Sequence, residues 1–217
     1  MKNNKLFIAS FITNIITFLL VLTGVILMLT IGSSALGETN ITVFKFFTFQ
    51  SNLFMGIVAF IYAIFQLLIL LNKRDKLPHV LLVFNYVGTT SVSLTFLVVV
   101  FFLGPIYGYN MMYLGANLFF HGLAPVAAMV GYMFIHKECQ IKFSDTFCAI
   151  IPPFLYGTVY LINVVANNGY GNVNYDFYMF GANGPFFGIL TFMLVMGVAY
   201  GFGVVLYTIN RLVFKKR

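Results

Sequence analysis

Six long apolar runs, separated by short connections, limit what this chain can fold into. A transmembrane helix needs roughly 20 mostly apolar residues, and each run has about that length. With 61% hydrophobic and 8% charged residues, the chain has too little polar surface to coat a soluble globule of 217 residues. We therefore predict an all-α polytopic membrane protein, a six-transmembrane-helix bundle that forms one membrane domain over residues 1–217. The runs cover about Leu6–Leu29, Thr48–Leu71, Val80–Leu103, Asn117–Ile135, Thr146–Val165 and Pro185–Ile209.

The positions of the basic residues predict how the bundle is oriented. Eleven of the twelve lysines and arginines precede the first run, lie between runs two and three or four and five, or follow the sixth, and only Lys45 falls on the other side. Positive residues beside membrane spans stay in the cytoplasm, so we expect both termini inside. The net charge of +7 is accounted for by this asymmetry. It leaves no basic soluble face that would bind nucleic acid.

The first run could be either a secretory signal or a membrane span. Lys2 and Lys5 precede the run and Ser33-Ser34-Ala35 follows it, as in a secretory signal, but its apolar core exceeds the about 7–15 residues of a signal h-region. We therefore expect a retained span.

Cys139 and Cys148 are both expected on the reducing side, so we predict no disulfide. We also expect no metal site and no cofactor, because the ligand sets and binding motifs are lacking.

The stretch Lys45–Asn52 places uncharged polar residues at the start of the second run. In a helix Thr48, Ser51, Asn52 and Met55 fall on one face, whereas Gln50 points elsewhere. Such side chains often join membrane helices, at around 0.6 kcal/mol per contact. A binding or reactive site is the alternative interpretation.

His121 is a possible partner for this polar face. It lies one turn after Asn117 near the start of the fourth run, and an imidazole within a membrane span is costly unless it is paired. Joining two helices would satisfy it, and so would a catalytic role. Because runs two and four cross in the same direction, Thr48 and His121 should lie at similar depth near the outer face. A histidine at that depth can serve as base for a threonine hydroxyl.

Two further expectations concern the fifth run and the connection after it. Pro152-Pro153 should kink or break the first turns of the fifth run. The outer connection over residues 166–183 is rich in glycine, asparagine and tyrosine, which is typical of a loop that covers a site. Its Asp176 is a candidate for binding substrate or for orienting His121.

At Lys45-Phe46-Phe47-Thr48-Phe49 and at His121-Gly122 the sequence resembles the androgen-induced family of integral membrane threonine hydrolases and their bacterial six-span relatives. Members of the family split fatty-acid esters of hydroxy fatty acids. The similarity extends over the whole layout, including the Tyr175-Asp176-Phe177 segment. It implies that Thr48 is the nucleophile and His121 its base, in a protein of a bacterial cell membrane.

The sequence departs from the animal branch of that family and is closer to the bacterial one. Animal members have an asparagine before the histidine and a second histidine three residues after it, where this chain has Phe120 and Ala124. The bacterial pattern is similar to Gln50-Ser51-Asn52 and to His121 followed by Pro125. The animal substrate therefore does not transfer to this chain.

The resulting hypothesis is hydrolysis of a lipid ester in the bilayer. Amides of Gln50, Asn52 or Asn117 are candidates to stabilise the oxyanion, and Ser51 is a rival nucleophile on the same face. The alternative is a transporter or a lipid-binding scaffold whose polar group binds a ligand without reaction. The substrate, the third catalytic group and the oligomeric state stay open.

Overall fold

A computed structural model describes residues 5–32 and 40–215 of the chain. Within that part, six helical segments are long and apolar enough to cross a membrane, which confirms the predicted all-α, six-span architecture of an integral multi-pass membrane protein. Their bounds lie close to the predicted runs, except that the sixth helix continues well past Ile209. The spans are Lys5–Thr30, Phe47–Leu70, His79–Tyr107, Ala116–Ile135, Phe143–Ala166 and Pro185–Phe214.

Three spans are single α-helices, and three are composite. The single helices are α1 (Lys5–Thr30), α2 (Phe47–Leu70) and α9 (Pro185–Lys215). The third span joins α3 (His79–Val98), the π-helical η2 (Val99–Leu103) and α4 (Gly104–Tyr107). The fourth joins α6 (Ala116–Leu118), the π-helical η3 (Phe119–Leu123), α7 (Ala124–Val130) and the π-helical η4 (Gly131–Ile135). The fifth joins the 3-10 helix η5 (Phe143–Ile150) and α8 (Ile151–Ala166), while η1 (Asn40–Lys45) and α5 (Tyr109–Met112) lie in connections.

The proline pair of the fifth span begins an α-helix rather than interrupting one. The α-helix α8 starts at Ile151, so Pro152 and Pro153 occupy its first turn, and the tighter 3-10 turns of η5 precede them. A proline in the first turn costs little, because its missing N–H would have no intrahelical partner there. The expected break is therefore a change of helix type at residue 151.

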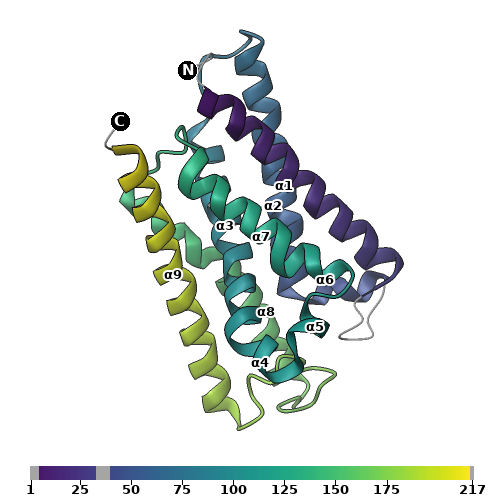
Figure 1. Cartoon of the computed structure of the whole chain (residues 1–217). Helices are drawn as coiled ribbons and strands as arrows, with labels where there is room; N and C mark the ends of the chain where they lie inside the picture. Colours follow the sequence, from purple (N-terminus) through teal and green to yellow (C-terminus); the bar gives the residue numbers. More distant parts are fainter. Residues whose placement is uncertain (1–4, 33–39, 216–217) are drawn as a thin grey trace.

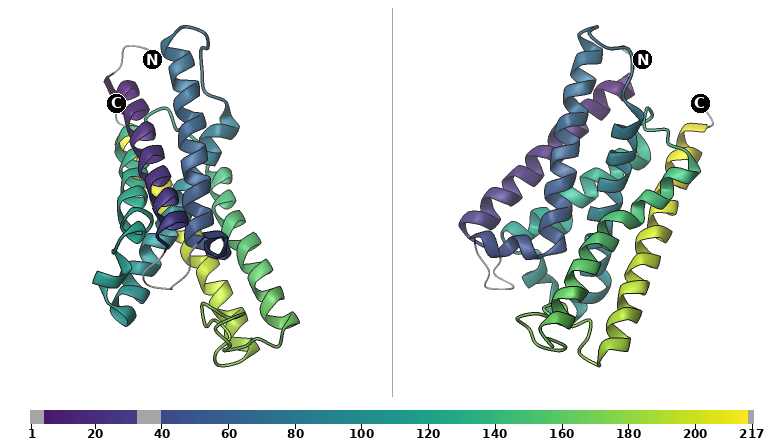
Figure 2. Two further views of the ribbon diagram at one scale, coloured as in Figure 1. Left: turned by 90° about the vertical axis from the view of Figure 1, so that its right-hand side faces the viewer. Right: turned by 180° about the vertical axis from the view of Figure 1, so that it is seen from behind.

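Both ends of the described chain lie at one end of the bundle (Figure 1). Helix α1 begins there and α9 ends there, together with the connections over residues 71–78 and 136–142 (Figures 1 and 2). We name it the basic end, because it carries most of the lysines and arginines. The connections over residues 104–115 and 167–184 lie at the other end, named the loop end.

The side chains are arranged as a bilayer requires, with polar groups inside and apolar groups outside. Helix α3 is the most buried of the six spans, and it packs against α2, α7 and α9. Its hydroxyls bond within the helix, as Thr90 does to the Tyr86 carbonyl and Ser93 to the Thr89 carbonyl. On α1, Asn14 faces the interior, while isoleucines such as Ile12 face outward. An outward apolar face is stable only against lipid.

Candidate functional site

The first turn of α2 lies at the loop end and is held by aromatic residues. The Tyr178 hydroxyl accepts a hydrogen bond from the Phe47 N–H at 3.0 Å, and the Tyr156 hydroxyl donates to the Lys45 carbonyl at 2.6 Å. The Phe46 ring meets the Phe177 ring edge to face, with centroids 5.4 Å apart. The connection over residues 167–184 therefore packs directly against the start of the helix that carries Thr48.

Asn52 links the start of α2 to the π-helical segment of the fourth span. Its fully buried amide nitrogen donates to the Thr48 carbonyl at 2.8 Å and to the Phe120 carbonyl at 3.2 Å. Phe120 lies within η3 and precedes His121 directly. One side chain thus sets the spacing between the backbones that carry the predicted nucleophile and the predicted base. The Asn52 carbonyl oxygen is buried without a hydrogen-bond partner.

The other polar residues of this stretch have different surroundings. The buried Ser51 hydroxyl lies 3.2 Å from the Thr48 carbonyl and 3.3 Å from the Thr95 hydroxyl of α3. Gln50 is exposed, and its amide donates to the Phe44 carbonyl at 2.7 Å. Thr48 itself is half-buried. The structure therefore separates Gln50 from the face that Thr48, Ser51 and Asn52 share.

His121 is buried within η3, and its tautomer is set by one hydrogen bond. Nδ1 lies 2.7 Å from the main-chain oxygen of Met112. A carbonyl only accepts hydrogen bonds, so Nδ1 carries the proton and Nε2 is left with its lone pair. A π turn inside an α-helical span is frequent at functional sites. The arrangement leaves an oriented imidazole whose Nε2 can accept a proton.

Two glycines and a tight helix contact position this imidazole. Gly108 and Gly115 adopt positive φ angles of 90° and 60°, which other residues rarely adopt, and the turns that they form bring the Met112 carbonyl back to His121. On the other side, Phe120 packs so closely on Gly24 of α1 that a Cβ at position 24 would lie 2.5 Å from the Phe120 ring. His121 is therefore held by α1, α2 and the residue 104–115 connection together.

The predicted pair lies at the same end of the bundle but is not joined by a hydrogen bond. No contact of that kind connects the Thr48 hydroxyl with the His121 imidazole, both of which belong to the described ranges. Asn117, one turn before His121, is buried in the same span. Catalytic hydrogen bonds are often long or absent before substrate binds, so their geometry alone does not exclude a catalytic pair.

Asp176 folds the connection that covers the loop end. Its Oδ2 accepts hydrogen bonds from the N–H groups of Gly171 and Gly181, both at 2.9 Å, and its Oδ1 accepts one from the Tyr160 hydroxyl. The side chain is fully buried. These donors occupy the carboxylate, and His121 Nδ1 bonds to Met112 instead, so in this structure Asp176 does not orient the imidazole.

An apolar groove of about 420 Å³ runs beside the polar stretch, between α2, α3 and the fifth span. Ser51 and Gln50 lie on its wall, and the other lining side chains are almost all apolar. Several of them are exposed on the outer surface of the bundle, including Phe84 at 46% and Leu155 at 60%. The groove therefore opens on the apolar outer surface of the bundle. It is lined by Phe47, Gln50, Ser51, Phe54, Val83, Phe84, Val87, Cys148, Ile151, Pro152, Leu155 and Tyr156.

The sequence analysis missed a second buried polar group at the basic end. It is built around His136 and Glu138, which follow the fourth span and look like part of a solvated connection beside Lys137. In the structure His136 is 1% exposed and Glu138 reaches side chains of α1 and α2. The sequence feature that could have indicated this group is the pair Ser10 and Asn14 on one face of α1, because buried polar side chains require polar partners. In the described ranges no three His, Cys, Asp or Glu side chains gather as a metal would require.

Comparisons with protein-family models, with curated proteins and with solved structures found no match to this chain.

Proposed function

We propose that this protein is an integral membrane hydrolase of lipid esters, with Thr48 as nucleophile and His121 as its base. The hydrogen bond from His121 Nδ1 to the Met112 carbonyl carries the proposal, because it leaves Nε2 free to accept a proton at the end of the bundle where α2 begins. A bare threonine hydroxyl is a poor nucleophile, so such a base is indispensable. The resemblance to the threonine hydrolases supports the same pair.

The spacing of the pair depends on Asn52. Its bonds to the carbonyls of Thr48 and Phe120 fix the two backbones, while the half-buried Thr48 side chain can still change rotamer. Closure would need a rotation of that side chain when the ester binds. Effective proximity of this kind supplies several kcal/mol of a barrier, roughly 7–11 kcal/mol in well-oriented cases.

The reaction has two balanced halves. His121 Nε2 takes the Thr48 hydroxyl proton, the threonine oxygen attacks the ester carbonyl, and the alcohol leaves with the proton returned by the imidazole. Water then attacks the acyl-threonine with the same base, which releases the fatty acid and restores Thr48. Because Asn52 already donates to two carbonyls, we assign it a positioning role, and we keep Asn117, buried in the same span as His121, as the candidate for the oxyanion. The positive end of the α2 dipole favours that developing charge.

The proposed substrate class follows from the groove on the Ser51 side of α2, whose lining includes neither Thr48 nor His121. The groove beside Ser51 suits an acyl chain that enters sideways from the bilayer, and the 167–184 connection packs over the aqueous side of α2. We infer a bacterial cell membrane from the resemblance to the bacterial six-span relatives, and termini in the cytoplasm from the positions of the basic residues. The site then lies toward the outer leaflet.

Labelling with a lipophilic fluorophosphonate tests the nucleophile. We expect purified protein to label in detergent, Thr48→Ala to abolish labelling, and Ser51→Ala to retain it. Thr23→Ala is the matched control, since Thr23 is an exposed threonine that bonds only within α1. Labelling that survives Thr48→Ala but not Ser51→Ala would transfer the nucleophile to Ser51.

The alternative is a lipid-binding scaffold or transporter, and one observation favours it: Thr48 and His121 share no hydrogen bond. A scaffold would bind a fluorescent fatty-acid ester and release no free acid. Release by the unaltered protein that is lost in His121→Gln supports the hydrolase. Equal release by both proteins, with ester binding intact, would support the scaffold.

A further inference from the structure

A polar cluster at the basic end is independent of the proposed catalytic pair. The carboxylate of Glu138 accepts hydrogen bonds from the Ser10 hydroxyl and, at 2.9 Å, from the Gln66 amide. Gln66 also donates to Ser10 at 2.8 Å, and its carbonyl oxygen accepts from the Asn14 amide at 3.1 Å. Polar side chains of two spans, α1 and α2, thus converge on one acid in the connection after the fourth span.

The donors around Glu138 are all uncharged. Within residues 5–32 and 40–215, no lysine or arginine forms an ion pair with it. The side chain is largely buried, and an isolated carboxylate in such surroundings is costly in its ionised form. Two neutral donors do not replace a counter-ion, so binding a proton is the simplest way to stabilise this acid.

Five of the six buried side-chain polar atoms without a hydrogen-bond partner in the described residues belong to α1, α2, α3, the fourth span and the connection that carries this acid. They are Asn14 Oδ1, Tyr62 Oη, Asn85 Nδ2, Tyr132 Oη and His136 Nε2. The rings of Tyr62 and His136 stack with centroids 5.9 Å apart, and His136 Nδ1 lies 3.4 Å from Asn85 Oδ1. Tyr62 interacts electrostatically with Glu138 and with Tyr132. Buried polar atoms are nearly always paired, and such a mixture of donors and acceptors is what buried water satisfies.

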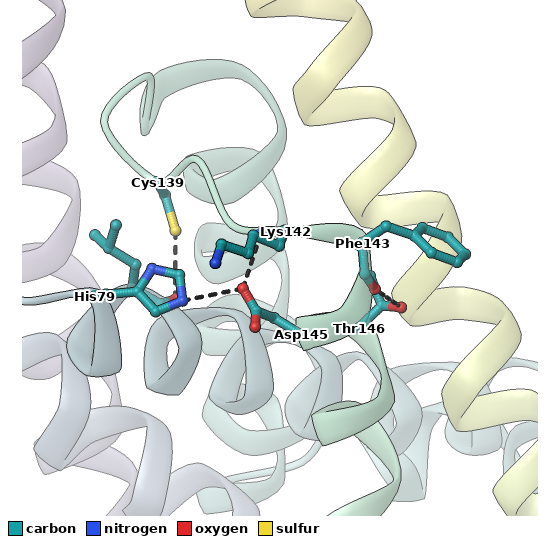
Figure 3. A network of polar contacts seen from close by, with 7 residues as sticks. His79, Cys139, Lys142, Phe143, Asp145 and Thr146 are labelled. Carbon is teal, nitrogen blue, oxygen red and sulfur yellow. Dashed lines mark hydrogen bonds and ion pairs between the residues drawn. The ribbon is translucent and has the colours of Figure 1, made fainter.

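The connection that carries the acid is fixed to the helices around it. The buried Cys139 thiol donates to the Leu82 carbonyl of α3 at 3.5 Å. Asp145 Oδ2 accepts from the Lys142 N–H at 2.8 Å and lies 3.1 Å from His79 Nε2 at the start of α3 (Figure 3). Asn210 of α9 donates to the Tyr132 carbonyl at 2.6 Å. The cluster therefore has a rigid boundary on the side of α3 and α9.

We propose that this basic-end cluster is a proton-binding site in which Glu138 holds an exchangeable proton. In it, ordered water forms hydrogen bonds to the five unpaired atoms, including His136 Nε2. Uptake transfers one proton from water at the basic end to the Glu138 carboxylate, and release returns it, with no change of oxidation state. The geometry agrees with the titration behaviour of the two groups. Burial raises the pKa of Glu138 to about 7, against the lowering effect of the Ser10 and Gln66 hydrogen bonds, and burial lowers the pKa of His136 to about 3.

The groups that face Glu138 from the packed elements are few. Helix α1 contributes the neutral Ser10, with Asn14 bonded to Gln66 behind it, and α2 contributes Gln66 and Tyr62. Cys139 of the connection also interacts with Glu138, whereas Asn85 of α3 reaches His136 and not the acid. Tyrosines and a buried thiol stay neutral near neutral pH, because burial raises the pKa of Cys139 and a phenol ordinarily titrates near 10. Glu138 is therefore the group of this cluster that changes charge there.

Infrared difference spectroscopy on the full-length protein in lipid vesicles tests the proposal. Between about pH 5 and pH 9 we expect a protonated-carboxyl C=O band that disappears with a midpoint near neutrality. The band should shift in D₂O, which shows an exchangeable proton, and should be lost in Glu138→Gln. Asp75→Asn is the control, because Asp75 is an exposed acid at the same end and its removal should leave the band in place.

A second variant separates loss of the site from loss of the fold. Ser10→Ala removes one donor to the carboxylate and should move the midpoint of the band to higher pH, while the rest of the amide spectrum is unchanged. If Glu138 stays ionised over the whole pH range, the site is permanently charged. If its carboxylate band shifts with added sodium chloride but not with choline chloride, the site binds a cation. Either result would overturn the proposal, and neither would affect labelling at Thr48.

Discussion

Replacing Asn52 by leucine separates its role in positioning from its role in stability. The substitution keeps the side-chain size and removes the two hydrogen bonds to the carbonyls of Thr48 and Phe120. Bonds of this kind are worth about 0.6 kcal/mol each in membrane proteins, so the loss is about 1 kcal/mol. The unpaired Asn52 Oδ1 is removed as well, which offsets part of that loss. We therefore expect only a small fall in the free energy of unfolding.

The effect on hydrolysis should be much larger. Without the link, η3 and α2 are free to shift relative to each other, and a misplacement of about 1 Å costs on the order of 10²-fold in rate. The measurements are fatty-acid release from an ester in mixed micelles and reversible unfolding in SDS–detergent mixtures. Asn163→Leu is the matched control, because Asn163 is an exposed asparagine of α8 outside the groove, and its amide oxygen accepts a hydrogen bond from Asn167. Activity of Asn52→Leu within about twofold of the unaltered protein would refute the positioning role.

Three further substitutions test other parts of the structure. Gly24→Ala places a Cβ 2.5 Å from the Phe120 ring, and we expect a loss of about 1–3 kcal/mol in stability together with reduced hydrolysis; Gly197→Ala, with open space around its Cβ, should have neither effect. Burial lowers the pKa of His136 from 6.5 to about 3, so the folded protein holds this side chain neutral where the unfolded chain would protonate it. The stability that depends on the neutral form is complete above pH 6.5, and up to about 5 kcal/mol of it is lost as the pH falls toward 3. His136→Gln should reduce this acid-induced loss of stability in thermal unfolding measured against pH. Tyr160→Phe removes a donor to Asp176, so limited proteolysis should cut the 167–184 connection faster, by a factor that corresponds to about 1–3 kcal/mol, and unchanged cleavage would contradict the anchoring role of Asp176.

The bundle was predictable because each span repeats one simple requirement of the bilayer, but the partners of individual side chains were not. Helical spacing separated Gln50 from Asn52, and the structure has Gln50 exposed and Asn52 buried. The hydrogen-bond partner of His121 is the main-chain oxygen of Met112, which turns at two glycines position. A main-chain acceptor of this kind cannot be predicted from the pattern of side chains.

Other differences have the same origin in tertiary contacts. The sixth helix passes its predicted end because the prediction followed the apolar run, whereas the helix continues into charged residues, with Arg211 over the Tyr207 ring, 5.6 Å from its centroid. His136 and Glu138 could not be recognised from the sequence because their polar partners come from α3 for His136 and from α1 and α2 for Glu138, all more than 50 residues away in sequence. Asp176 lies in the connection between the fifth and sixth spans, as predicted, but two of its donors are backbone groups of a turn that only the folded loop creates.

The π-helical turns have a consequence for how this chain relates to others through evolution. Each π turn accommodates one residue more than the α-helical path, so η3 acts as a single-residue insertion near the start of a hydrophobic span. A relative whose fourth span is regular α-helix would lack that residue. Its histidine would then fall out of phase with His121 unless a gap were opened inside the helix, where insertions and deletions are rarely accepted. In such a lineage, the insertion that forms the π turn and the change that turns the histidine toward the bundle interior would occur in one evolutionary step.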